Sequence, residues 1–198
     1  MAENILVLLL AALPLMGSPG PATLSAAATG SVYGIARGIP YLTGICLGTA
    51  TVLAIIATGV TGVLFTVPGL MPVLTIAAAA YILYLAYRIA TAPVLSEDKG
   101  DRPAPAFAGG YLLAIANPKA YAAIGAVYTS VIVIADAPIR DAAVKLIVLS
   151  IVIVAVNTTW LVLGAGLARL LRHPTAGRIA NITFAILLVG SVVLALLG

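Results

Sequence analysis

Charged side chains are scarce in this sequence. They make up 8% of its 198 residues, whereas hydrophobic residues make up 63%. A soluble domain usually has about 25% charged residues, and a chain so poor in charge could not cover its surface with polar groups. A lipid bilayer removes that need, because the outer surface of a membrane protein is apolar. The composition therefore predicts an all-α integral membrane protein.

Residues that bind metals or form catalytic pairs are scarce as well. The sequence has one histidine, His173, and one cysteine, Cys46, and its six acidic residues fall in predicted loops or at segment ends. A transition-metal site needs several such ligands, and general acid–base catalysis needs a suitable pair of side chains. We therefore expect no metal, no cofactor and no enzymatic activity, although a serine–lysine pair that uses Lys119 stays an alternative.

Six apolar segments are each long enough to cross a bilayer, which takes about 20 helical residues. These segments lie near residues 4–29, 39–65, 70–92, 107–134, 142–168 and 178–197. Residues 93–106 are polar, charged and proline-rich, which is typical of a linker within one transmembrane domain, 1–198. The linker separates two repeats of three helices, about 1–92 and 107–198. Because three is an odd number, the second repeat enters the membrane from the opposite face, as in the inverted repeats of transporters.

Prolines interrupt the first helix of each predicted repeat. Ser18–Pro21 has the sequence SPGP, and Asn117–Pro118 lies in the corresponding helix of the second repeat. Proline removes a backbone donor and clashes with the preceding turn, so both helices should be kinked or locally unwound. Many membrane helices tolerate proline without any functional role. Two breaks in corresponding positions, however, indicate the binding site of a transporter.

Lys119 is the one charged residue deep in an apolar segment. Such a residue indicates a function, although a lysine can also extend along its stem to the membrane surface. We favour a polar cavity beside the Asn117–Pro118 break, where Lys119 would pair with a carboxylate of a transported solute. The candidate substrate-binding residues are Pro19, Gly20, Pro21, Thr23, Thr49, Asn117, Pro118, Lys119 and Asn157. For Asn157 and the threonines, hydrogen bonds within or between helices are an alternative role.

The basic residues predict the orientation of the chain. Seven of the ten fall on the face opposite the N-terminus, namely Arg37, Arg88, Lys99, Arg102, Arg169, Arg172 and Arg178. Arg140 and Lys145 fall on the N-terminal face. Because cytoplasmic loops are enriched in lysine and arginine, we expect a cytoplasmic-membrane protein with both termini outside. The basic residues form no patch, which argues against a nucleic-acid partner.

Motifs in these segments resemble the LysE/RhtB family of amino-acid exporters. Pro19–Pro21 (PGP) is similar to a signature in the family's first helix, and Asn117–Ala120 (NPKA) to a motif in its fourth helix. The remaining matches are Gly34, Arg37, Gly38, Gly44, Gly48, Ala80–Leu85 and Phe107–Gly110. The glycine pairs have the spacing that lets helices pack closely. The resemblance covers nearly the whole chain.

The resemblance implies export of amino acids or related small solutes, driven by an ion or membrane gradient and without a cofactor. Family members commonly carry an acidic residue at the position of Thr49. Its absence here favours neutral over basic amino acids as substrates. The expected partners are an amino-acid-like substrate and the lipid bilayer, while a coupling ion and a homo-oligomer stay open. The alternative function is a non-transporting membrane assembly factor or scaffold.

Overall fold

The computed structural model describes residues 1–59, 70–91, 103–170 and 174–197, in which every regular element is a helix. The helices are α1 (Ala2–Gly17), α2 (Pro21–Ala57), α4 (Leu70–Ala90), α5 (Phe107–Ile115), α6 (Pro118–Ser130), α7 (Pro138–Leu170) and α8 (Pro174–Leu197). The all-α class is therefore confirmed. Residues 60–65 of the second predicted segment, most of the predicted linker and His173 lie outside the described residues.

Both predicted helix breaks are present. Residues 18–20 separate α1 from α2, and residues 116–117 separate α5 from α6. Pro21 and Pro118 are the first residues of α2 and α6. Proline suits that position, because the missing N–H would have no partner in the helix and the fixed φ is already helical. The prolines therefore start new helices instead of kinking continuous ones.

The long helix α2 changes direction at Gly34, which has φ 76° and ψ 173°. Only glycine adopts this combination without strain. The predicted connection between the first two apolar segments, residues 30–38, is therefore helical apart from this one turn. A Cβ atom at Gly34 would meet nothing within 4 Å. The packing role expected for Gly34 is thus wrong, and glycine is needed there for the backbone turn.

Close helix crossings join α2 to α5 and to α7. A Cβ atom at Gly44 would overlap the carbonyl oxygen of Phe107, and one at Gly48 would lie 2.6 Å from the carbonyl oxygen of Tyr111. Gly164 of α7 lies equally close to the backbone of α2. Without side chains at these points the helix backbones can touch. The packing role predicted for Gly44 and Gly48 is confirmed.

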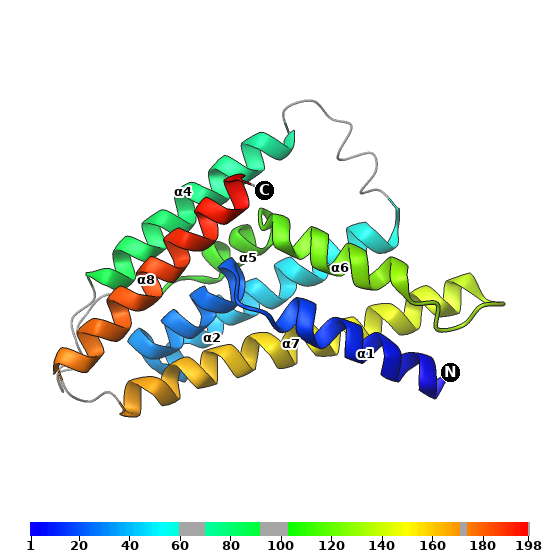
Figure 1. Cartoon of the computed structure of the whole chain (residues 1–198), viewed down its shortest axis with the longest axis horizontal. Helices are drawn as coiled ribbons and strands as arrows, with labels where there is room; N and C mark the ends of the chain where they lie inside the picture. Colours follow the sequence, from blue (N-terminus) through cyan, green and yellow to red (C-terminus); the bar gives the residue numbers. More distant parts are fainter. Residues whose placement is uncertain (60–69, 92–102, 171–173, 198) are drawn as a thin grey trace.

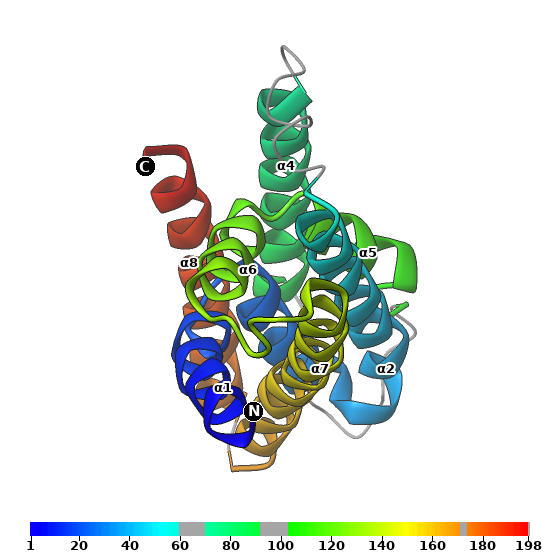
Figure 2. The same cartoon turned by 90° about the vertical axis from the view of Figure 1, so that its right-hand side faces the viewer.

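Buried apolar residues form two clusters. The first joins α2, α4, α5 and α8 and includes Tyr41 and Leu113. The second joins α1, α2, α6 and α7 and includes Leu8 and Leu149. Figure 1 shows α4 and α8 side by side, and Figure 2 shows α1 next to α7, with α6 above α1. The two clusters give the helix bundle two apolar cores.

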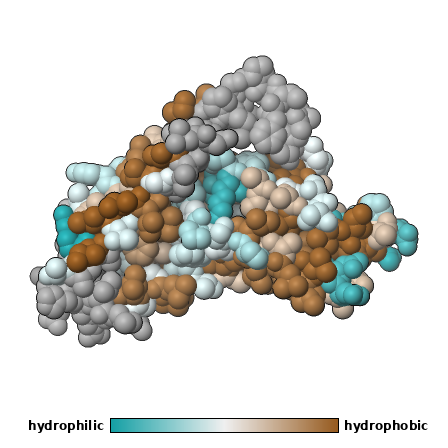
Figure 3. All heavy atoms as spheres, in the orientation of Figure 1, coloured by the Kyte–Doolittle hydropathy of each residue, from teal (hydrophilic) through white to brown (hydrophobic). Residues whose placement is uncertain are grey.

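The outer surface is also largely apolar. Figure 3 shows hydrophobic residues over much of the visible face, with hydrophilic residues near its ends and at a spot in the middle. Several large apolar side chains are more than 60% exposed, namely Leu10, Ile76, Ile132, Ile151 and Ile186. Two of the described helices, Pro21–Ala57 and Pro138–Leu167, are long and apolar enough to cross a bilayer. Such a surface suits lipid rather than water.

An ion pair fixes the segment between α6 and α7. The Nζ atom of Lys145 lies 2.8 Å from Oδ2 of Asp141, and the two side chains are 5% and 13% exposed. Oδ1 of Asp141 accepts the backbone N–H groups of Val133 and Ile134, at 2.6 and 2.9 Å. Lys145 also donates to the carbonyl oxygen of Tyr128, at 3.0 Å. Lys145, which the sequence places on the N-terminal face, therefore also has a structural role.

Replacing Asp141 with alanine should destabilise the fold. The change leaves the Lys145 ammonium buried without its counter-charge and removes the acceptor of two backbone N–H groups. Asp141 is partly exposed, so the loss of the ion pair and of the two hydrogen bonds should cost about 1–3 kcal/mol. Thermal unfolding of the purified protein in detergent should therefore begin several degrees lower. Asp136→Ala is the matched control, since Asp136 is exposed in the same segment. Equal midpoints for the two variants would contradict a structural role for the ion pair.

Candidate functional site

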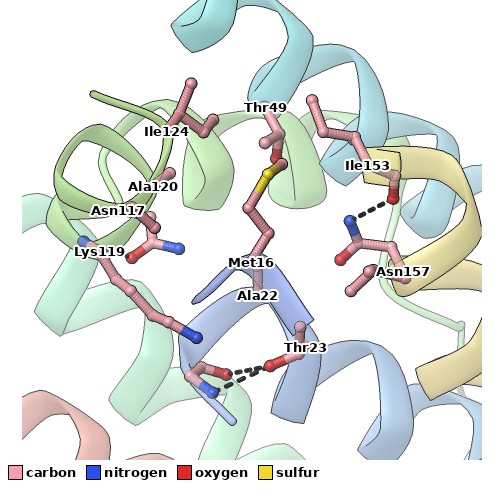
Figure 4. A pocket seen from close by; sticks show the side chains of 13 residues that line it. Met16, Ala22, Thr23, Thr49, Asn117, Lys119, Ala120, Ile124, Ile153 and Asn157 are labelled. Carbon is pink, nitrogen blue, oxygen red and sulfur yellow. Dashed lines mark hydrogen bonds between the residues drawn. The ribbon is translucent and has the colours of Figure 1, made fainter. Parts of the chain in front are cut away.

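A cavity lies where the two helix breaks meet (Figure 4). It holds about 440 Å³ of space, including its open mouth. The lining residues come from α1, α2, α6 and α7 and from the residues just before α2 and α6. They are Met16, Gly20, Ala22, Thr23, Thr49, Asn117, Lys119, Ala120, Ala123, Ile124, Ile153, Val156 and Asn157. Lys119 is the one charged side chain in this lining, which contains no carboxylate.

Lys119 connects the two breaks. It is the second residue of α6, and its ammonium donates to the carbonyl oxygens of Ser18 and Pro19, the latter at 3.2 Å. The side chain passes directly over Gly20, where a Cβ atom would lie 2.6 Å from Cδ of the lysine. Glycine at this position therefore makes room for the lysine. The sequence left two positions open for the Lys119 side chain, a polar cavity beside the break or the membrane surface. In the structure it lies in the cavity beside the break.

Thr23 organises the break before α2. Its Oγ1 accepts the backbone N–H of Gly20 at 2.9 Å and lies 3.2 and 3.3 Å from the carbonyl oxygens of Gly20 and Ser18. A hydroxyl has one proton, so it donates to one of these oxygens at a time. These bonds satisfy backbone groups that the start of a helix leaves unpaired. Because the Ser18 carbonyl also binds Lys119, Thr23 helps to position the oxygen that holds the lysine.

Asn117 caps the start of α6. Its Oδ1 accepts the backbone N–H of Lys119 at 3.2 Å, and the side chain is 4% exposed. Asparagine is among the preferred residues at this position. Figure 4 shows the amide nitrogen of Asn117 directed toward the cavity. Both α2 and α6 therefore begin at the cavity, and the positive ends of their dipoles add to the charge of Lys119 in favouring an anion.

Asn157 on α7 and Thr49 on α2 lie across the cavity from Lys119 (Figure 4). Nδ2 of Asn157 donates to the carbonyl oxygen of Ile153, and Oγ1 of Thr49 donates to that of Ile45, both at 2.8 Å. The Asn157 and Thr49 side chains are 5% and 8% exposed. These bonds use one amide proton of Asn157 and the hydroxyl proton of Thr49. Oδ1 of Asn157 and Oγ1 of Thr49 therefore remain as acceptors at the cavity. This wall therefore offers uncharged acceptors.

The structure brings together six of the nine residues proposed from the sequence. These are Gly20, Thr23, Thr49, Asn117, Lys119 and Asn157. Pro19, Pro21 and Pro118 shape the breaks but do not line the cavity. The lining residues that the sequence analysis missed are Met16, Ala22, Ala120, Ala123, Ile124, Ile153 and Val156. They are ordinary apolar residues within apolar segments, although Ile153 shares a face of α7 with Asn157 by its spacing of four.

Trp160 positions the first break and was also missed. Its Nε1–H donates to the carbonyl oxygen of Gly17, the last residue of α1, at 3.0 Å. The bond satisfies a carbonyl that the end of the helix leaves without a partner in the helix. Trp160 is the only tryptophan in the chain. Because a buried indole N–H needs an acceptor, a lone tryptophan in an apolar segment was a usable signal.

Comparisons with known proteins cover nearly the whole chain. The family described as LysE type translocator matches residues 13–197, which include both breaks and the whole lining of the cavity. The Cysteine/O-acetylserine efflux proteins of Salmonella choleraesuis (strain SC-B67) and Salmonella typhimurium (strain LT2) are each 32% identical to this chain over 182 residues. The alignments cover 87% of this chain and 87% of each relative. No solved structure gives a significant match.

Replacing Thr23 with valine should loosen the first break. The change keeps the shape of the side chain but leaves the buried N–H of Gly20 without its acceptor, at a cost of about 1–2 kcal/mol. Hydrogen exchange measured by mass spectrometry should become faster in residues 18–24. Thr159→Val is the matched control, because Thr159 is exposed and donates to the Ala155 carbonyl of its own helix. If exchange in residues 18–24 were the same in both variants, the capping role of Thr23 would be wrong.

Proposed function

The chain belongs to the LysE type translocator family, and we propose that it exports small neutral amino acids or their derivatives from the cytoplasm. Membership in a family of membrane translocators sets aside the enzyme and scaffold alternatives raised by the sequence. The observation that carries the proposal is the cavity at the two breaks, with Lys119 as its one charged lining residue. A solute with a carboxylate group fits this arrangement of charge.

The Lys119 ammonium and the two helix starts would bind the carboxylate of the solute. Asn117 and Gly20 precede α6 and α2, whose positive dipole ends meet at the cavity. Such ends stabilise anions in transporters built from broken helices. In the structure the ammonium is bound by the carbonyl oxygens of Ser18 and Pro19. An incoming carboxylate would take over part of that interaction and so contact both breaks at once.

The lining favours a neutral side chain on the solute. A second cationic group would lie near Lys119 without a counter-charge, because no carboxylate lines the cavity. An unpaired charge in an apolar environment is costly. Ala22, Ala120 and Ala123 leave room for a small apolar or hydroxylated group. The relatives are named for efflux of cysteine and O-acetylserine, which are small amino acids, and this agrees with the proposal.

Six membrane crossings in two inverted repeats would provide alternating access to this cavity. The first crossing would comprise α1 and the part of α2 before Gly34, and the fourth would comprise α5 and α6. Figure 1 supports an inverted relation, since α1 runs toward the cavity and α6, which contacts it, runs away. Rocking of one repeat against the other would open the cavity to each side in turn. With both termini outside the cytoplasmic membrane, the solute would leave by the face that carries them.

Replacing Lys119 with alanine should abolish export. Loss of a charge-assisted hydrogen bond to the carboxylate corresponds to about a ten- to hundredfold loss of affinity. Lys119→Arg keeps the positive charge and should retain part of the activity. The measurement compares internal and external pools of cysteine, O-acetylserine and other amino acids in cells that overproduce each variant.

Arg140→Ala is the control for removal of a positive charge, because Arg140 is exposed at the start of α7. Its pools should match those of the wild type. The amount of each variant in the membrane fraction is measured in parallel, so that failed insertion is recognised. Unchanged efflux by a normally inserted Lys119→Ala variant would refute the role of Lys119.

A further inference from the structure

We propose that Asn157 recognises the α-ammonium group of the solute, so that the site selects α-amino acids over carboxylic acids without an amino group. The inference rests on the proposed function and adds to it the basis of selectivity. It follows from an unsatisfied acceptor in the wall of the cavity opposite Lys119. The acceptor is Oδ1 of Asn157.

Oδ1 of Asn157 is buried and has no hydrogen-bond partner among the described residues. The assignment of oxygen and nitrogen is not arbitrary, because the other amide atom faces the carbonyl oxygen of Ile153 at 2.8 Å. Only an N–H donor is favourable there, since the reverse orientation would set two oxygens against each other. The oxygen is therefore the atom directed away from the helix. Buried acceptors are rarely left unpaired, so a donor from a ligand is the natural partner.

The two walls of the cavity match the two charged groups of an amino acid. One wall has the Lys119 ammonium and the amide nitrogen of Asn117, both donors (Figure 4). The opposite wall has Oδ1 of Asn157 and the hydroxyl oxygen of Thr49, both acceptors. An α-amino acid carries its carboxylate and its ammonium on one carbon atom. With the carboxylate at Lys119, the ammonium can point toward Asn157.

An uncharged acceptor also suits a transporter, which has to release its solute. A carboxylate at position 157 would hold the ammonium by a full ion pair and would also attract the Lys119 side chain across the cavity. An amide oxygen binds an ammonium more weakly and leaves Lys119 bound to the carbonyl oxygens of the first break. Asn157 can therefore bind the amino group without drawing the Lys119 side chain across the cavity.

The test compares O-acetyl-L-serine with 3-acetoxypropanoate, the same molecule without its amino group. Purified protein is reconstituted into liposomes, and each compound competes against counterflow of labelled O-acetyl-L-serine. Wild-type protein should prefer O-acetyl-L-serine by about ten- to hundredfold, the range expected for one hydrogen bond to a charged group. Asn157→Leu should reduce this preference to less than about threefold by weakening binding of the amino acid alone. Asn157→Gln keeps an uncharged amide oxygen as acceptor and should retain part of the preference.

Asn181→Leu is the control for loss of a buried amide, because Asn181 is 7% exposed on α8 and does not line the cavity. Its preference should equal that of the wild type. If Asn157→Leu weakened both compounds equally, or left their ratio unchanged, Asn157 would have a structural role only and the inference would be wrong. If liposomes with wild-type protein transported neither compound, the proposed function would be contradicted, and the inference with it.

Discussion

The ammonium of Lys119 is bound by two carbonyl oxygens from the break between α1 and α2. In an apolar environment an ammonium needs acceptors, and unwound backbone needs donors. Lys119 meets both needs, because it extends from the start of α6 to residues about 100 positions earlier in the chain. The two breaks therefore have to lie side by side. The cavity between them and its positive charge follow from this single contact.

The rest of the structure holds the two breaks in place. Thr23 and Asn117 satisfy backbone groups at the helix starts, and Trp160 satisfies a carbonyl at the end of α1. Glycine crossings fix α2 against α5 and α7, and the buried Asp141–Lys145 pair fixes the segment between α6 and α7. The helix ends at the cavity are thus held by side chains, whereas the helices themselves are held by apolar packing. The cavity borders both apolar cores, since Ala22 belongs to the first and Ile124 and Ile153 belong to the second.

The sequence predicted the features that interrupt its apolar pattern. SPGP, Asn117–Pro118 and Lys119 stand out from their surroundings, so both breaks and the charged cavity residue could be identified. Asn157 stood out as an amide in an apolar segment, but its unpaired oxygen depends on the bond to Ile153, which no sequence pattern reveals. Met16 and Ile124 line the cavity without any distinguishing signal, because they are as apolar as their neighbours. The turn at Gly34 was missed because one glycine supports either close packing or a change of backbone direction.

Binding of a solute should therefore change the dynamics of both breaks at once, because Lys119 belongs to the second break and its ammonium is bound by the first. Hydrogen exchange of the wild-type protein, with and without an amino acid that it exports, measures this most directly. The account predicts slower exchange on binding in residues 18–24 and in residues 116–121 together, with little change in α8. Protection of a region away from both breaks, or of neither break at saturating solute, would contradict it.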